Sequence, residues 1–186
     1  MSINPLQLSF YKGAGGKHGA IQFNLQKPHY YVKSNPKLKN YNGKFIPEDW
    51  LMDNPHLTRD DLSSREGALF LEICSTKGAN EYNWEKKIVM ALSIHDMGKV
   101  LTVLEGLKKD VDIMHDPGAK SSTAGEIRKK LIVNSPEGIK SGVIVTVTMK
   151  DKSEETTKHT VPLSCEEARV LAICIRSFIP VALGWL

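Results

Sequence analysis

The sequence has few cysteines and no long apolar run, and each shortage excludes a class of protein. Cys74, Cys165 and Cys174 are far apart and in no metal-ligand spacing, so we expect no metal site and free, buried thiols in a reducing compartment. No apolar stretch approaches the roughly 20 residues of a membrane-spanning helix, so we expect no membrane partner. The amino terminus has neither a signal-peptide core nor an Arg-rich presequence, and we expect that any transit peptide was removed ahead of Met1.

The first 47 residues contain no acidic residue, but they carry several lysines and most of the aromatic residues of the chain. The whole chain has a formal net charge of +4 at pH 7. Lysines with aromatic rings between them suit single-stranded nucleic acid, because the cations bind phosphates and the rings stack on bases. The alternative is a solvated basic flank whose aromatic residues pack in hairpins and core.

Alternating apolar and polar residues predict one α+β domain over residues 1–186, built largely from antiparallel strands with one solvated face. We expect strands near residues 6–11, 20–25, 29–33, 68–75, 84–92, 111–114, 126–135, 143–150 and 156–161. Residues 34–64 are rich in Asn, Pro, Lys, Asp and Gly instead, which predicts a long loop excursion.

Each half of the chain closes with a predicted helix. Ser93 is followed three residues later by Asp96, and Ser164 by Glu167, so both serines are candidate N-caps. The second helix is apolar on most sides, which predicts that it is buried by oligomerisation. Pro180 is expected to kink or end this helix.

Three patterns suggest chemistry at first sight but have structural interpretations. The glycine-rich segment 12–19 lacks a Ser or Thr after Lys17, so it predicts a flexible hairpin rather than a phosphate loop. His95–Asp96 lies in the first turn of a predicted helix, and His115–Asp116 lies in a predicted turn before Pro117. We therefore expect a binding protein with no catalytic residue, no metal and no cofactor, and not an enzyme.

Several segments, in order over about residues 82–186, resemble the Whirly superfamily of plant single-stranded DNA-binding proteins and kinetoplastid mitochondrial RNA-binding proteins. They are Tyr82 to Ser93, the helix Ile94 to Leu104, His115-Asp116-Pro117, Glu126 to Leu131 and Phe178 to Trp185. Nearer the amino terminus, Tyr11-Lys12-Gly13 and Lys17 to Ile21 resemble the plant Lys-Gly-Lys-Ala-Ala-Leu signature, but with glycine-rich residues inserted.

The resemblance implies two four-stranded antiparallel sheets, each followed by a helix, packed as a tetramer. The interrupted signature and the excursion at 34–64 favour the kinetoplastid branch. That branch implies a mitochondrial matrix protein in a heterotetramer with a paralogous subunit, holding guide RNA by its backbone and promoting its annealing to mRNA in RNA editing. One alternative is a plant-like single-stranded DNA-binding protein, self-assembled as a homotetramer, in organellar genome maintenance or transcription. Another is a structural scaffold that docks protein.

The candidate contacts for nucleic acid are basic and aromatic residues on these strands and loops. Phosphate contacts are predicted at Lys12, Lys17, Lys33, Lys37, Lys39, Lys44, Arg128, Lys130, Lys150 and Lys158. Base stacking is predicted at Tyr11, Tyr30 and Tyr31. Lys86, Lys87 and Lys129 are left out of this set, because each could pair with a neighbouring carboxylate.

Overall fold

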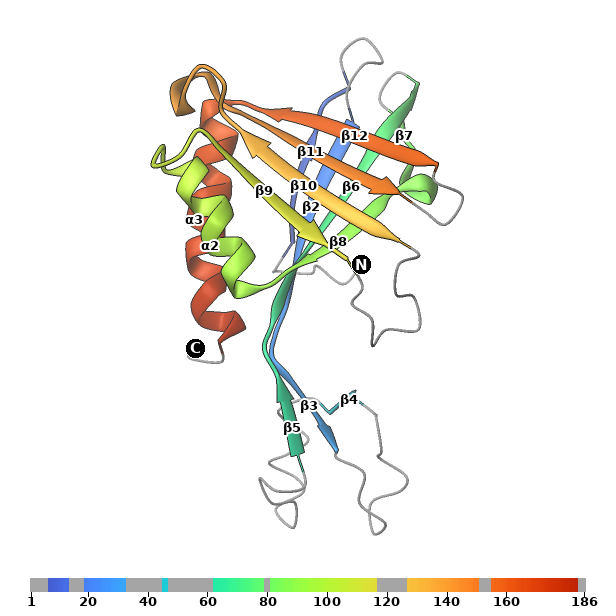
Figure 1. The fold of residues 1–186 in the computed structure, drawn as a ribbon, viewed down its shortest axis with the longest axis vertical. Coiled ribbons are helices and arrows are strands. Elements are labelled where there is room, and N and C mark those ends of the chain that lie inside the picture. Colours follow the sequence, from blue (N-terminus) through green and yellow to red (C-terminus); the bar gives the residue numbers. More distant parts are fainter. Residues whose placement is uncertain are drawn as a thin grey trace.

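The first half of the chain forms an antiparallel sheet in the computed structural model, which describes residues 7–13, 19–32, 45–46, 62–78, 81–116, 127–150 and 155–183. Its strands are β1 (Gln7–Tyr11), β2 (Gly19–Gln26), β6 (Ala68–Gly78), β7 (Glu81–Tyr82) and β8 (Ile88–Leu92). Their order is β1-β2-β6-β7, and β8 pairs with β6 (Figure 1). The β2–β6 register places Ile21 opposite Ile73 and Phe23 opposite Leu71, so their apolar side chains share the buried face.

The predicted loop excursion contains some regular structure. Its described parts contribute to a three-stranded sheet of β4 (Phe45–Ile46), β3 (His29–Val32) and β5 (Leu62–Arg65), in that order. The prediction of a loop throughout 34–64 is therefore wrong at 45–46 and 62–64. The rest of the excursion lies outside the described residues.

The second half forms a four-stranded antiparallel sheet. Its strands are β9 (Asp110–His115), β10 (Arg128–Asn134), β11 (Val143–Lys150) and β12 (Thr156–Leu163), in the order β12-β11-β10-β9. Val145 and Val147 are buried on one face of β11, while Thr146 and Thr148 lie on the other. The predicted solvated face of this sheet is thus confirmed.

A capped helix follows each sheet, as predicted. α2 (Ile94–Leu104) begins after Ser93 and α3 (Cys165–Ala182) after Ser164, and both serines form reciprocal capping boxes with the residue three positions on. The two helices pack against each other on one side of the sheets (Figure 1). No described helix has the length and apolar character needed to cross a membrane.

The core lies where the two sheets and the helices meet. Phe23 and Leu71 from the first sheet, Leu131 from the second and Leu171 from α3 belong to one buried cluster. Burying a side chain of this size stabilises the fold by about 1.5–3 kcal/mol relative to leaving it exposed. This shared core fixes the two sheets relative to each other, and with them the edges on which the candidate site lies.

Two local predictions are wrong, and one of the two effects expected of Pro180 does not occur. Residues 84–86 form a 3₁₀ turn, η4 (Trp84–Lys86), rather than the start of a strand, because the polar run Glu85 to Lys87 offers no alternating apolar face. His115 ends β9 instead of lying in a turn. Pro180 was expected to kink or end α3; it does not end the helix, which continues to Ala182.

The proline is tolerated because it lies in the last turn, where few hydrogen bonds follow it. The amide of Leu183 still donates to the Ile179 carbonyl at 3.0 Å. The carbonyl of Ala182 accepts from the amide of Gly67 at 2.8 Å, which ties the end of the helix to the first sheet. A Cβ at Gly67 would lie 2.5 Å from the Gln26 carbonyl oxygen, so this close approach requires glycine.

Candidate nucleic-acid interface

An open groove of about 530 Å³ lies where the edges of the two sheets meet. β8 is paired only with β6, and β9 only with β10, so each strand presents a free edge in the described part of the chain. The two strands approach each other where β9 ends (Figure 1). The groove is lined by Val89, Met90, Ala91, Met114, His115, Asp116, Ile127 and Lys129.

The walls of this sheet-edge groove are mainly apolar, with a few polar groups among them. Met114 is 63% exposed although it is a large hydrophobic residue, and Ala91 is also exposed. Apolar walls with a few placed polar groups are typical of ligand sites. A base or sugar could pack against such walls while its phosphate reaches a cation.

Lys129 provides that cation. Its Nζ donates to the backbone carbonyl of Val89 at 2.7 Å, which links β10 to the free edge of β8. Burial lowers the pKa of Lys129, since a charged amine loses hydration there. A partly desolvated ammonium attracts an anion more strongly than one in bulk water, because screening is weaker. The sequence allowed Lys129 and Lys87 to pair with neighbouring carboxylates. Lys129 instead contacts this carbonyl, whereas Lys87 does pair with Glu72 at 2.6 Å.

The groove also contains a histidine held by a helix cap. His115 Nε2 lies 3.0 Å from Oδ2 of Asp96, and the same carboxylate oxygen accepts from the hydroxyl of Ser93 at 2.8 Å. Burial acts to raise the pKa of Asp96, but hydrogen bonds from Ser93 and His115 outweigh it and lower that pKa below its usual value. The two His-Asp sequences thus meet through Asp96 and His115 in a structural cap. No group of three metal-ligating side chains occurs among the described residues.

Four of the predicted phosphate contacts gather on the solvated face of the second sheet. The strand register places Lys130 beside Thr148, and Thr148 beside Lys158, in one row across three strands. The next row places Arg128 beside Lys150. Lys130 is also paired in register with Met114, so the first row reaches the sheet-edge groove. We call these four cations the sheet rows.

Carboxylates lie beside Arg128 and Lys130 in the sheet rows. Arg128 lies 3.3 Å from Asp116, and Lys130 lies 2.5 Å from Asp112. All four side chains are substantially exposed, and exposed ion pairs contribute only about 0–1 kcal/mol. A phosphate can therefore replace these carboxylates at little cost. Within the described residues, Lys158 forms no ion pair.

The predicted contacts near the amino terminus are only partly described. Lys12 forms an ion pair with Glu167, a member of the α3 capping box. Burial acts to raise the pKa of Glu167, but hydrogen bonds from Lys12 and Ser164 outweigh it, so this pKa is lower than usual. Lys12 is therefore already engaged. Five other predicted contacts lie outside the described residues, namely Lys17, Lys33, Lys37, Lys39 and Lys44.

Among the predicted stacking residues, Tyr11 can be placed fully. It is 52% exposed, and its ring lies 5.2 Å from that of Tyr82 in a tilted arrangement. The exposed ring offers a face or edge to a base. Tyr30 and Tyr31 lie on β3, whose backbone alone is described.

Sequence reasoning missed the residues that form the groove itself. Lys129, Met114 and His115 line it, yet none was predicted as a contact. The alternation of β10 placed Lys129 on the apolar face with Leu131 and Val133, and a lysine within an apolar face is a usable signal of a special role. The meeting of β8 and β9 depends on how the sheets pack, and no local pattern reports it.

The sequence comparisons identify relatives over the later part of the chain. Residues 54–174 match the family described as Whirly transcription factor. A mitochondrial single-stranded DNA-binding protein of Arabidopsis thaliana, WHY2, is 31% identical over 122 residues, which are 65% of this chain and 50% of that protein. A chloroplastic single-stranded DNA-binding protein of Solanum tuberosum, WHY1, is 30% identical over 124 residues, 66% of this chain and 44% of that protein. The chain thus spans about half the length of the curated relatives it matches.

Solved structures share the fold. The crystal structure of WHY3 from Arabidopsis thaliana has a TM-score of 0.70 at 24% identity, covering 96% of this chain and 89% of that one. The plant transcriptional regulator PBF-2 has a TM-score of 0.69 at 25% identity, covering 96% and 82%. These relatives are plant proteins, so the comparisons favour the plant branch over the predicted kinetoplastid branch. The inserted glycines and the excursion at 34–64 were poor guides to the branch.

Proposed function

Because the chain belongs to the Whirly family, we propose that it binds single-stranded nucleic acid, with single-stranded DNA as its main ligand. The observation that carries this proposal is the open groove at the sheet edges, with apolar walls and the partly buried ammonium of Lys129, leading onto the sheet rows. The relatives are named as single-stranded DNA-binding proteins. These names support the plant-like alternative, a single-stranded DNA-binding protein, over the guide-RNA annealing function.

The chemistry of the interface supports binding without strong sequence preference. The sheet rows offer amines, a guanidinium and threonine hydroxyls, which are groups that bind phosphate oxygens. Phosphates carry no sequence information, and apolar walls accept the face of any base. A single strand fits better than a duplex, because its bases are free to enter the groove.

Binding rather than catalysis is supported by how the titratable groups are used. The carboxylate of Asp96 caps α2 and bonds to His115, and the amine of Lys129 bonds to a backbone carbonyl. In the described structure these groups hold protein atoms in place. We propose no catalytic residue and no cofactor.

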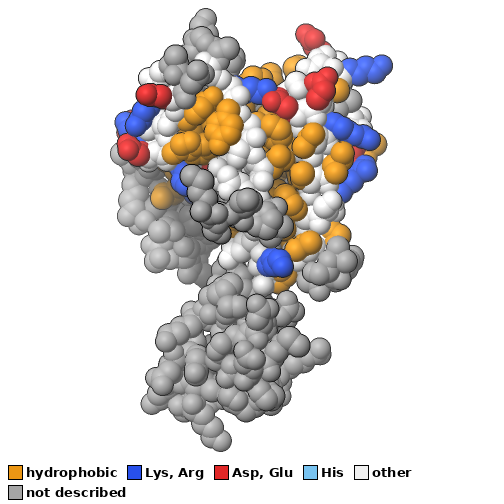
Figure 2. Space-filling view, turned by 180° about the vertical axis from the view of Figure 1, so that it is seen from behind, with side chains coloured by type: hydrophobic (Ala, Val, Ile, Leu, Met, Phe, Trp, Pro, Cys, Tyr) orange, Lys and Arg blue, Asp and Glu red, His pale blue; other side chains and the backbone are white. Residues whose placement is uncertain are grey.

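The exposed face of α3 supports assembly into a tetramer with the helices inside. Val170 is 44% exposed and Ile173 is 54% exposed, on a helix whose opposite face is buried in the core. Hydrophobic side chains lie uncovered along the helical side of the molecule when it is seen from behind (Figure 2). Exposed apolar residues on one helix face are typical of a subunit interface. We propose a homotetramer; a paralogous subunit remains the other possible partner.

An organelle is the proposed location. The relatives from Arabidopsis thaliana and Solanum tuberosum are named as mitochondrial and chloroplastic, respectively. We propose that this protein acts in one of these organelles, on the genome or its transcription. Import of the full-length protein, fused to a fluorescent reporter, distinguishes mitochondria from plastids and from other compartments.

The test of the proposed function is a competition experiment. A fluorescent single-stranded DNA oligomer is bound, and unlabelled DNA, RNA of the same sequence and duplex DNA compete for the protein. We expect single-stranded DNA to compete best and the duplex to compete poorly. Equal or better competition by RNA, together with faster annealing of complementary RNA strands, would support the guide-RNA function instead. The absence of any single-strand binding at low salt would leave the scaffold interpretation.

A further inference from the structure

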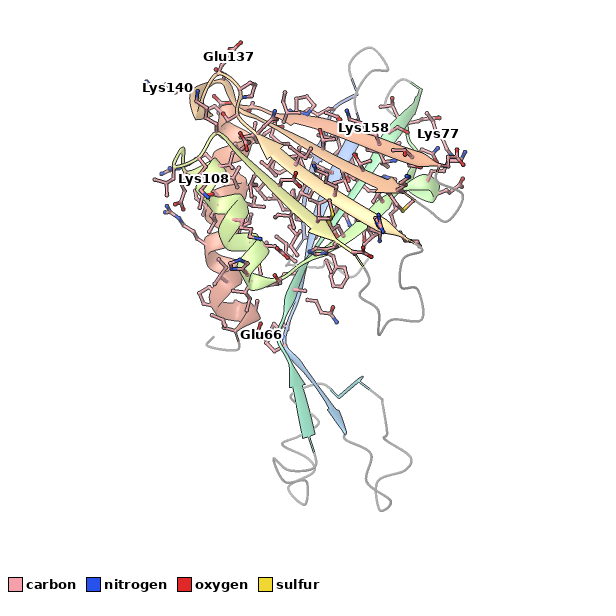
Figure 3. All side chains as sticks on the ribbon, viewed as in Figure 1. Glu66, Lys77, Lys108, Glu137, Lys140 and Lys158 are labelled. Carbon is pink, nitrogen blue, oxygen red and sulfur yellow. The ribbon has the colours of Figure 1, made fainter. Side chains whose placement is uncertain are left out.

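A second basic hollow lies at the opposite end of β9 from the sheet-edge groove. It has a volume of about 360 Å³ and is formed by two connections, one between α2 and β9 and one between β10 and β11. Lys108, Lys140 and Glu137 lie at the same corner of the molecule, whereas Lys158 lies toward the other end of the sheet (Figure 3). This loop-end pocket is lined by Gly106, Lys108, Lys109, Ser135, Glu137, Gly138 and Lys140.

One hydrogen bond fastens the two connections to each other, and a second braces the β10–β11 connection internally. The amide of Ser135 donates to the carbonyl of Lys109 at 2.7 Å, and the Ser135 hydroxyl donates to the carbonyl of Gly142 at 2.8 Å. Ser135 is only 2% exposed. Gly138 has a φ of 89°, a left-handed conformation that allows the tight turn. The backbones that carry the three lysines are therefore held together in a fixed arrangement.

The charges in the loop-end pocket are unbalanced. Three ammonium groups line it, with one carboxylate, that of Glu137. Within the described part of the chain, Lys108, Lys109 and Lys140 form no ion pair. Gathering like charges in one hollow costs free energy that a bound anion would relieve. A phosphate group is a suitable anion, because its oxygens can accept hydrogen bonds from several lysines at once.

We propose that the loop-end pocket binds a phosphate of the same nucleic acid strand that occupies the sheet-edge groove. This inference rests on the proposed function. β9 has six residues, and at about 3.3 Å per residue it separates the two sites by roughly 20 Å. Asp110 and Asp112 are exposed between the sites and repel phosphates, so the strand contacts the two ends of β9 rather than its length.

This arrangement predicts a dependence on strand length. A short oligomer fills the groove but does not reach the loop-end pocket, whereas a long one contacts both sites. Leu107 is 73% exposed beside Lys108 and offers an apolar contact to a base or sugar at the second site. The lysines of the pocket should therefore contribute to the binding of long strands alone.

The test uses salt titrations with two oligothymidylates, of about 3 and about 24 nucleotides, lengths that bracket the usual site sizes of single-strand-binding domains. The double substitution Lys108→Gln/Lys140→Gln removes two charges from the pocket. The matched control, Lys27→Gln/Lys86→Gln, removes two exposed charges elsewhere. Glu137→Gln changes the pocket in the opposite direction and so excludes general damage to the fold as the cause of an effect.

We expect the pocket double variant to lower the salt slope for the long oligomer by about 0.7, since the pocket holds one phosphate and each phosphate contact contributes about 0.7 for a single strand. Its slope for the short oligomer should match that of the unsubstituted protein, and Glu137→Gln should tighten long-strand binding alone. An unchanged slope for the long oligomer, or an equal loss at both lengths, would overturn the inference. So would pocket-dependent binding to vesicles of anionic phospholipid without any length effect on DNA. A failure of the unsubstituted protein to bind either oligomer would instead contradict the proposed function.

Discussion

The ammonium group of Lys129 and the backbone carbonyl of Val89 form a 2.7 Å hydrogen bond between the two sheets. Val89 lies on the free edge of the first sheet, and Lys129 lies at the start of β10 in the second. One lysine thus fixes the spacing of the groove walls and places a positive charge within it.

Replacing Lys129 by an uncharged residue measures what its charge contributes to DNA binding. Lys129→Met should lower the affinity for single-stranded DNA and reduce the salt slope by about 0.7, because one phosphate contact is lost. Its stability should change little, since the orphaned carbonyl of Val89 costs about 1–3 kcal/mol while the cost of burying the ammonium disappears. Anisotropy titration and urea unfolding measure the two effects. Lys86→Met is the control, and a salt slope identical to that of the control would remove Lys129 from the interface.

The carboxylates beside the sheet rows should act against binding. Asp112→Asn frees Lys130 from its 2.5 Å ion pair and removes a charge that repels phosphate, so affinity for single-stranded DNA should rise. Lys130→Gln should lower affinity by a similar factor. Because the pair is exposed, neither change should alter stability by more than about 1 kcal/mol. Weaker DNA binding by Asp112→Asn at low salt would show that the sheet rows do not face the phosphates.

Tyr11 should contribute through its ring rather than its hydroxyl. If a base stacks on this exposed residue, Tyr11→Ala should cost about 1–3 kcal/mol of binding free energy, while Tyr11→Phe keeps most of the affinity. Quenching of tyrosine fluorescence on DNA binding should be reduced in both variants. Equal affinities for Tyr11→Ala and the unsubstituted protein would restrict the aromatic pair of Tyr11 and Tyr82 to a structural role.

The cap of α2 predicts a pH dependence of stability. The pKa of Asp96 is lower in the folded protein than in the unfolded chain, so its stabilising effect is complete above the unfolded pKa of about 3.9. It is lost as the pH falls through the folded pKa. The difference in unfolding free energy between the unsubstituted protein and Asp96→Asn should therefore be largest near neutral pH and shrink below pH 4. Urea unfolding across this range measures it.

Asp110→Asn is the control for this pH dependence, because Asp110 is an exposed residue at the start of β9. Its substitution should give a small stability difference that hardly varies with pH. A difference for Asp96→Asn that is constant from pH 7 to pH 3 would contradict the role of its ionised carboxylate.

The apolar face of α3 should hold subunits together. Ile173→Asp places a charge on the exposed stripe of this helix and should dissociate the assembly, because an unpaired charge is costly to bury in an interface. Leu107→Asp is the control, since Leu107 is even more exposed but lies in the loop after α2 rather than on the exposed stripe of α3. Sedimentation velocity measures the result. A monomeric unsubstituted protein at micromolar concentration, or an Ile173→Asp variant that sediments with it as a tetramer, would contradict the proposed assembly.

Local patterns predicted the elements of the fold well, because local physics determines them. Ser93 and Ser164 cap helices through contacts three residues away, so short sequences contain the whole signal. The alternation along β11 likewise reports which face is buried. Trp84 to Lys86 was mispredicted because β-prone residues beside lysines do not reveal whether a sheet partner is in reach.

The candidate site was less predictable, since it depends on contacts between distant parts of the chain. Arg128 and Lys130 could be assigned to the solvated face from the period of β10 alone. The contact between Lys129 and Val89 joins residues 40 positions apart, and the pairing of Lys12 with Glu167 joins residues 155 apart. Neither partner could be chosen from the sequence, because each pair meets through the packing of the sheets and helices.

The most direct test of the central claim is hydrogen–deuterium exchange with and without a saturating single-stranded DNA oligomer. We expect slower exchange in peptides that cover the facing edges, β8 (Ile88–Leu92) and β9 (Asp110–His115), and the start of β10 at Arg128. Peptides from α3 (Cys165–Ala182) should exchange at the same rate in both states. Protection confined to other parts of the chain, with β8 and β9 unchanged, would contradict the claim that the strand lies in the sheet-edge groove.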